Sequence, residues 1–179
     1  MHSFAMTAVG ARIPKRGAWI NSQLLPQPGF SYVSAKWESS TTCLTVGNSS
    51  QSSAVLRSTD SGRTWTDVTN NNNMQNFVLT DIAFDEFYVV TGRNPDGSSP
   101  IGVVYTSNDG VDFGLGFLVS PGAGLNGAAV GYNNMNGWTA CVVGVLGKIY
   151  RSYYDLKEND FISWADVSPI RMTVMRSLR

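Results

Sequence analysis

The sequence predicts an all-β protein: a β-propeller, or a segment of one, with about three and a half four-stranded blades. The first observation is the composition, which is rich in Gly, Ser, Thr and Asn but has only four lysines and three glutamates. That balance disfavours helices and suits short strands joined by polar turns. The second observation is a repeat of about 46 to 51 residues, and the third is that each period holds about four strand-like runs. Repeats of this length with four strands each are typical of propeller blades.

Two sets of residues mark the period. Four aromatic residues follow one another at intervals of 46, 48 and 51 residues: Trp19, Trp65, Phe113 and Trp164. Three glycines each end a β-branched run in a corresponding place: Gly47, Gly92 and Gly144. Both sets divide the chain in the same way, so we take their common spacing as the length of one blade.

This phase predicts the elements in chain order. The chain begins within a blade, so the first element is a half blade, followed by three full blades and one terminal strand: 1–29, 30–69, 76–120, 124–168 and 169–179. Unpaired sheet edges at both ends would promote aggregation. The ends therefore close a four-bladed ring together, combine with a second chain, or cap against a different protein in a larger assembly.

The stretch STDSGRTW explains how a blade turns between its third and fourth strands. Asp60 is expected to accept backbone N–H bonds across the turn, and Ser58 to add a hydroxyl bond. Gly62 can adopt a positive φ without a steric penalty, and Trp65 then packs between the sheets. We interpret these four residues as a structural turn rather than as a catalytic or metal-binding site.

The stretch TSNDGVDF repeats the pattern with Thr106, Asn108, Gly110 and Phe113, whereas the copy at 148–168 lacks its glycine. STDSGRTW resembles the Asp-box, or BNR repeat, whose pattern is Ser/Thr-x-Asp-x-Gly-x-x-Trp/Phe. TSNDGVDF resembles it with Asn108 in the aspartate position. The resemblance implies a propeller like those of sialidases, sortilin-type receptors, some xyloglucan-cleaving glycosidases and photosystem II assembly factors. Their activities differ, so it implies a fold and no single activity.

The resemblance also offers one substrate-binding candidate. Arg12-Ile13-Pro14 is similar to the Arg-Ile-Pro of sialidases, which would place substrate binding on Arg12. The acidic-Arg pair of the second strand is missing, and the only late glutamate, Glu158, falls in an irregular turn. We therefore predict no sialidase activity. The pair Asp85-Glu86 falls at an expected hairpin turn, where carboxylates are usually solvated, so no glycosidase or other catalytic residue is predicted.

Other site chemistries lack the necessary residues. His2 is the single histidine, so no metal site, cofactor or Ser-His-Asp site is predicted. Cys43 and Cys141 are expected to be buried thiols on opposite sides of their sheets. The formal net charge of zero gives no general attraction to nucleic acid, and no apolar run is long enough for a membrane span.

The remaining candidates are polar loops. Loops that link blades, and the loop between the second and third strands of the second blade, should lie on one face. Their candidate ligand residues are Asn72, Asn73, Arg93, Asn94 and Asp96. Ordinary turn chemistry explains the same residues, and we give it the greater weight.

We therefore predict a non-enzymatic scaffold or interaction subunit of a larger assembly, such as a virus particle or a surface structure. Its expected partners are other protein chains, or further copies of itself, joined through the terminal strands. The first alternative is a carbohydrate-binding propeller related to glycoside hydrolases, with a glycan as ligand. The second is an organelle assembly factor, suggested only by an N-terminal segment without acidic residues. The sequence does not fix the compartment.

Overall fold

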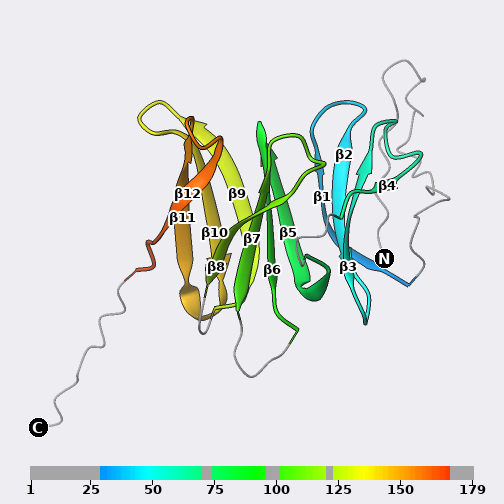
Figure 1. Cartoon of the computed structure of the whole chain (residues 1–179), viewed down its shortest axis with the longest axis horizontal. Coiled ribbons are helices and arrows are strands. Elements are labelled where there is room, and N and C mark those ends of the chain that lie inside the picture. Colours follow the sequence, from blue (N-terminus) through cyan, green and yellow to red (C-terminus); the bar gives the residue numbers. More distant parts are fainter. Residues whose placement is uncertain (1–28, 70–73, 96–100, 120–122, 170–179) are drawn as a thin grey trace, which may run out of the picture.

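The computed structural model describes residues 29–69, 74–95, 101–119 and 123–169. In this part of the chain the fold is all-β, with three four-stranded antiparallel sheets placed side by side (Figure 1). The predicted fold class is therefore confirmed. The predicted half blade and terminal strand lie outside the described residues, apart from residues 29 and 169 at their inner ends.

Each sheet is a simple meander of four consecutive strands. The first sheet contains β1 (Ser31–Trp37), β2 (Cys43–Asn48), β3 (Ser53–Ser58) and β4 (Thr66–Asp67). The second contains β5 (Val78–Asp85), β6 (Phe87–Arg93), β7 (Gly102–Ser107) and β8 (Gly114–Val119). The third contains β9 (Leu125–Asn133), β10 (Gly137–Gly144), β11 (Ile149–Asp155) and β12 (Asp160–Asp166). Two short 3-10 turns, η1 (Met74–Asn76) and η2 (Val145–Gly147), precede β5 and follow β10.

The first strands of the three sheets pack against one another, with β5 between β1 and β9. Their pairing with the second strand shifts register once in each sheet, a β-bulge at corresponding places in the repeat. The glycines that mark the period lie beside these bulges. A Cβ atom on Gly144 would lie 2.6 Å from the Gly124 carbonyl oxygen, so backbone crowding excludes a side chain there.

Two buried clusters join the sheets. The first interface, between the first and second sheets, contains Leu44, Val46, Val55, Met74, Leu79, Ile82, Tyr88, Val90, Val103, Tyr105 and Phe113. The second interface, between the second and third sheets, contains Val89, Val104, Val119, Ala123, Leu125, Ala140, Val142, Tyr150 and Phe161. Side chains alternate between the two faces of a strand, so β6 and β7 supply both clusters. The second sheet is thus buried on both faces.

The hairpin turns β1–β2, β3–β4, β5–β6, β7–β8, β9–β10 and β11–β12 all lie at one end of the sheets, which is uppermost in Figure 1. We call this the hairpin end. Among the described residues, no helix is long and apolar enough to cross a membrane.

Candidate functional site

The first Ser-Asp turn, residues 58–64, is held together by its own side chains. The Ser58 hydroxyl donates to Asp60 Oδ1 at 2.9 Å and accepts the Gly62 backbone N–H at 2.9 Å. Asp60 also accepts the backbone N–H groups of Arg63 and Thr64, at 2.9 and 2.8 Å, and the Thr64 hydroxyl. These donors, those of Thr64 first, lower the pKa of Asp60 to about 2. The Asp60 carboxylate therefore accepts hydrogen bonds from two backbone N–H groups and two hydroxyls of its own turn.

The backbone conformation of this turn favours glycine at position 62. Gly62 has φ +81°, and its neighbour Ser61 also has a positive φ, 64°. A Cβ atom at Gly62 would lie 3.7 Å from the Trp65 ring, which is half-buried. Trp65 therefore covers the turn.

The second Ser-Asp turn, residues 107–112, is displaced by one residue from the sequence prediction. The hydrogen bonds come from Ser107 and Asp109, not from Thr106 and Asn108: Ser107 accepts the Gly110 N–H at 2.9 Å, and Asp109 accepts the N–H groups of Val111 and Asp112. In the second turn Gly110 follows Asp109 directly, whereas in the first turn Ser61 lies between Asp60 and Gly62. The Ser/Thr-x-Asp-x-Gly pattern therefore falls on Thr106 and Asn108, one residue before the pair that forms the hydrogen bonds. Bonds to the Asp112 and Val111 N–H groups lower the pKa of Asp109.

The displaced residues have other surroundings. Thr106 is buried in β7, and the Asn108 amide donates to the Asn159 carbonyl of the third sheet at 3.0 Å. Gly110 has φ +68°, and a Cβ atom there would lie 2.8 Å from the Tyr88 ring. Phe113 is fully buried in the first interface.

The predicted ligand residues are only partly within the described chain. Asn72, Asn73 and Asp96 lie outside the described residues, as does Arg12. Arg93 is exposed at the end of β6, and Asn94 Oδ1 accepts the Ile101 N–H at 2.8 Å, which closes the loop that follows. These two residues are not shown to form a ligand site, and this part of the prediction stays a prediction.

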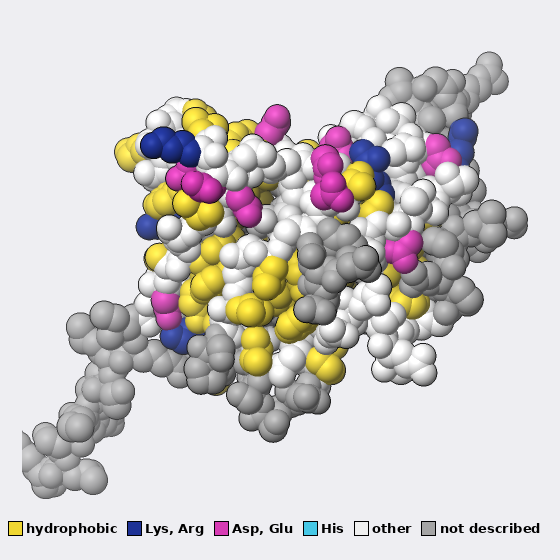
Figure 2. Space-filling view, viewed as in Figure 1, with side chains coloured by type: hydrophobic (Ala, Val, Ile, Leu, Met, Phe, Trp, Pro, Cys, Tyr) yellow, Lys and Arg dark blue, Asp and Glu magenta, His cyan; other side chains and the backbone are white. Residues whose placement is uncertain are grey.

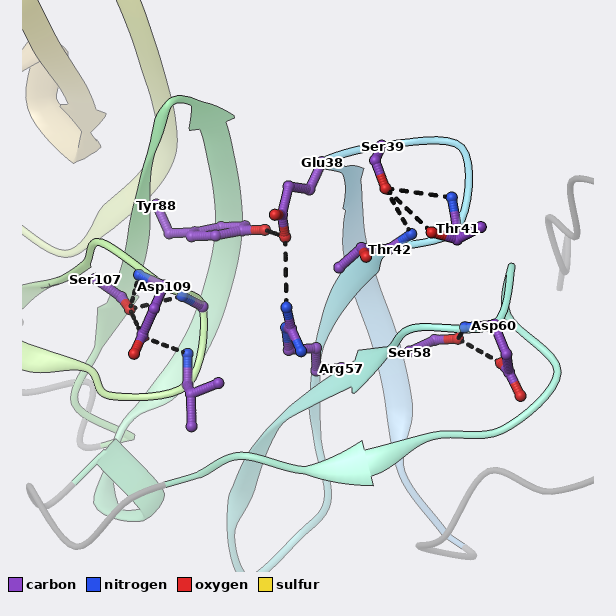
Figure 3. A network of polar contacts seen from close by, with 12 residues as sticks. Glu38, Ser39, Thr41, Thr42, Arg57, Ser58, Asp60, Tyr88, Ser107 and Asp109 are labelled. Carbon is purple, nitrogen blue, oxygen red and sulfur yellow. Dashed lines mark hydrogen bonds and ion pairs between the residues drawn. The ribbon is translucent and has the colours of Figure 1, made fainter. Parts of the chain in front are cut away.

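A polar cluster at the hairpin end joins the first two sheets and was not predicted (Figure 3). The Tyr88 hydroxyl donates to Glu38 Oε2 at 2.6 Å, and Arg57 Nη2 lies 3.7 Å from the same oxygen. Burial of the tyrosine, and then the Glu38 carboxylate, raise the pKa of Tyr88 far above its usual value. Tyr88 therefore stays protonated and acts as a donor that locks the two sheets together.

Asp81 forms a second unpredicted link, between all three sheets. Its Oδ1 accepts the Ser34 hydroxyl of β1 at 2.6 Å, and its Oδ2 accepts the Ala128 N–H of β9 at 3.0 Å. The aspartate lies at the bulge of β5, where the three first strands meet. We interpret it as a structural bridge, since its acceptor atoms are directed at protein donors.

The remaining candidates also have structural explanations. Asp85 and Glu86 are exposed at the β5–β6 turn, where Glu86 has φ 70°. Cys43 is buried, which raises its pKa to about 11, but Cys141 is only half-buried, contrary to prediction. The described residues contain no group of three or more His, Cys, Asp or Glu side chains placed to hold a metal ion.

One sheet face is not covered by another sheet within the described residues. On β10, Ala140 and Val142 are buried in the second interface, and the alternate residues Thr139, Cys141 and Val143 face away from it. Val143 is 44% exposed. On β11, Arg151 is exposed and its guanidinium lies 4.9 Å from the centre of the Tyr153 ring. We call the surface made by Thr139, Cys141, Val143, Arg151 and Tyr153 the open face of the third sheet.

An aromatic row lies at the hairpin end above the second interface. It runs from Tyr132 to Trp138, Phe87 and Tyr154, with successive ring centroids 5.2, 5.7 and 3.9 Å apart. Tyr132 is 60% exposed, and Met135 at the tip of the β9–β10 turn is 94% exposed. In Figure 2, hydrophobic side chains are visible at the upper left, where the β9–β10 turn lies in Figure 1. Others gather over the outer strand β8. Exposed aromatic rings with a methionine are typical of interaction surfaces.

Comparison with known proteins gives no family. No family model matches the sequence, and no curated protein matches it. Among solved structures, the GH74 xyloglucanase from Xanthomonas campestris is similar with a TM-score of 0.47 and 16% identity. The match covers 70% of this chain and 18% of the xyloglucanase chain. The resemblance to the Asp-box stays a prediction, and this likeness assigns no activity.

Proposed function

We propose that the protein is an interaction subunit that assembles, without catalysis, with a second copy of itself through the open face of the third sheet. The observation that supports this is a contrast between equivalent positions. The equivalent positions lie on the second strand of each sheet and pair with the residue that follows the bulge in the first strand. They are occupied by Val46, Thr91 and Val143. Val46 and Thr91 are 0% exposed, whereas Val143 is 44% exposed.

The neighbouring position repeats the contrast. Two residues earlier on the same three strands, the equivalent residues are Leu44, Val89 and Cys141. Leu44 and Val89 are fully buried. Cys141 is only half-buried. The third sheet thus carries a packing surface like the two that are covered in this chain. Burying its apolar area would be favourable by roughly 25 cal/mol for each Å² removed from water.

The charge on this face suits a second β-sheet. Arg151 of β11 corresponds to Arg57 of β3, because Arg57 pairs with Leu44 and Arg151 pairs with Cys141. Arg57 lies beside Glu38 and the Tyr88 hydroxyl of the neighbouring sheet at the first interface. Arg151 has an aromatic ring beside it but no carboxylate partner among the described ion pairs. A docked sheet with an acidic or hydroxyl group at its edge would complete the arrangement.

A second copy is the partner we favour. On the far side of the first sheet, Ala54 and Leu56 of β3 are already fully buried, so a head-to-tail contact has no exposed counterpart there. The open faces would instead meet each other in a two-fold dimer, the commonest symmetric arrangement. The formal net charge is zero, so charge repulsion does not oppose self-association.

The test is the solution mass of the full chain by light scattering coupled to size exclusion, over a hundredfold range of concentration. We expect a concentration-dependent mass approaching twice 19.4 kDa. Val143→Lys should shift the chain to monomer, because it would bury a second positive charge on a face that already carries Arg151. It should leave the monomer folded, since Val143 reaches solvent there.

Leu118→Lys is the matched control. Leu118 is 49% exposed on the outer strand β8, away from the open face. Its substitution should leave the dimer unchanged. A wild-type monomer at all concentrations, or a dimer that survives Val143→Lys, would refute the proposal.

A further inference from the structure

The two Asn-Gly sequences of the chain lie in contrasting places in the third sheet. They are Asn126-Gly127, within β9, and Asn136-Gly137, at the β9–β10 turn. In such a sequence the glycine nitrogen can attack the asparagine amide, because glycine has no side chain to block the approach and its backbone adopts many conformations. Both groups belong to one chain, so the rate of the reaction depends on how freely the structure lets them meet.

Asn126-Gly127 is fixed by the residues on either side of it. Before it, the Leu125 carbonyl accepts the Thr80 hydroxyl of β5 at 2.9 Å. After it, the Ala128 N–H donates to Asp81 Oδ2 of β5 at 3.0 Å. The Asn126 side chain is exposed, but turning the backbone between the two residues would strain both bonds to β5. The folded structure therefore opposes the reaction at this sequence.

Asn136-Gly137 has more room and more freedom. Asn136 is exposed, and Gly137, the first residue of β10, has φ +70°. A Cβ atom at Gly137 would meet nothing within 4 Å, whereas one at Gly127 would lie 3.2 Å from Val143 Cγ2. Space for a new ring is thus present at the turn, and the tips of exposed loops are where local rearrangement is easiest.

The other two asparagines of the turn are less suited to the reaction. The Asn133 side chain is engaged on both atoms: its Oδ1 accepts the N–H groups of Met135 and Asn136, and its amide nitrogen donates to the Thr139 hydroxyl. Asn134 is exposed, but the residue after it is Met135, whose side chain hinders the approach of the backbone nitrogen. The turn therefore singles out Asn136.

We propose that Asn136 is a modification site, at which the folded protein deamidates through a cyclic imide formed with Gly137. The Gly137 nitrogen bonds to the Asn136 amide carbon, the carbon–nitrogen bond of the amide breaks, and the amide leaves as ammonia with the proton of the glycine nitrogen. Water then opens the five-membered ring at either carbonyl. The products are aspartate and isoaspartate, and no oxidant or reductant takes part.

Either product changes the hairpin end. The new carboxylate adds one negative charge to a chain whose formal net charge is zero. The isoaspartate also lengthens the main chain by one methylene group, at the place where Gly137 pairs with Asn133. Asn136 is not among the residues of the open face, so the modification goes beyond the proposed dimer and does not depend on it.

The experiment is incubation of the full chain at physiological temperature and mildly alkaline pH, with peptide mapping by mass spectrometry at intervals. We expect the mass gain of an amide-to-acid exchange at Asn136, at a rate at least tenfold above that at Asn126. The same incubation in concentrated urea is the control for the role of the structure. In the unfolded chain the two sequences should react at rates within threefold of each other, because neither is then held by β5.

Matched variants locate the reaction by ion exchange of the intact protein. Asn136→Gln should lose the acidic species that accumulates in the wild type, and Asn126→Gln should keep it. Asn136→Asp marks where the aspartate product elutes. Val143→Lys should deamidate at the wild-type rate, so failure of the dimer and failure of this site are distinguishable.

Three results would overturn the inference. The first is a rate at Asn126 equal to or above that at Asn136 in the folded chain. The second is no conversion of Asn136 in the folded chain over a period in which the unfolded chain converts. The third is an acidic species that forms in Asn136→Gln as it does in the wild type.

Discussion

The two interfaces between sheets are built differently. In the first interface three of the five aromatic rings, Tyr88, Tyr105 and Phe113, are fully buried, Phe77 and Phe84 are partly buried, and the Tyr88 hydroxyl donates to Glu38. In the second interface most rings are only partly buried: Phe87, Phe117, Trp138, Tyr154 and Trp164. The first interface is thus closed at its rim by a hydrogen bond, whereas the second leaves aromatic surface at its rim. The comparison teaches that a repeated packing plan can hold a fold together at one junction and leave surface for binding at the next.

The largest difference is expected between Phe113→Ala and Phe117→Ala. Phe113 is fully buried, so its removal should lower the free energy of unfolding by about 4 kcal/mol through lost burial and a cavity. Phe117 is half-buried beside Trp164 and Tyr150, and its removal should lower it by about 1.5 kcal/mol. Urea denaturation measures both. Equal losses would break the comparison.

Gly102→Ala tests how tightly the second interface is packed at its backbone. A Cβ atom at Gly102 would lie 2.4 Å from the Ala123 carbonyl oxygen and 2.7 Å from Leu125 Cγ. Relieving this overlap requires backbone movement, so stability should fall by about 2 kcal/mol. In Gly114→Ala the new Cβ meets nothing within 4 Å, and thermal unfolding should change little. A tolerated Gly102→Ala would mean that the second interface is loose throughout.

The smallest effects concern two adjacent residues. Asp109→Ala removes the acceptor of the turn that covers Tyr88 at the first interface and should cost about 1 kcal/mol at pH 7. Asn108→Ala removes an exposed bond to Asn159 above the second interface and should stay within about 0.5 kcal/mol. Chemical denaturation of the two variants in one buffer compares them directly. A larger loss for Asn108→Ala would restore the turn register expected from the sequence.

The Asp109 effect should depend on pH. Its pKa is lowered in the folded protein, so its contribution is complete above the ordinary value of 3.8 and is lost as the pH falls below it. The difference between wild type and Asp109→Ala should therefore shrink in acid. A difference that persists unchanged below the folded pKa would show that the carboxylate charge is not its source.

The repeat could be predicted from the sequence because the same backbone features, and the glycines beside them, recur in every sheet. Gly47, Gly92 and Gly144 occupy corresponding places beside the bulges, and this spacing was visible without any structure. The first turn was also readable, since Ser58, Asp60 and Gly62 interact within five residues. The second turn was misplaced because one residue fewer separates its aspartate from its glycine.

The contacts between sheets could not be read in this way. Glu38 and Tyr88 are 50 residues apart, and Ser34 and Asp81 are 47 apart. Their meeting depends on how one sheet lies against the next, which no local pattern encodes. The exposure of a side chain could not be predicted either, because Val143 and Val46 are the same residue type in similar strands. Within the described residues, a neighbouring sheet covers Val46 but not Val143.

The simple meander of each sheet has an energetic consequence. Among the described residues, every sheet pairs only consecutive strands, and the three sheets pack on one another in chain order, as in a linear repeat array. The stability of such arrays is approximately the sum of a term for each unit and a term for each junction. Within the described residues the second sheet takes part in both junctions. Weakening either terminal unit should therefore loosen the molecule from that end inward, and the middle unit should be the last to exchange its amide protons with solvent.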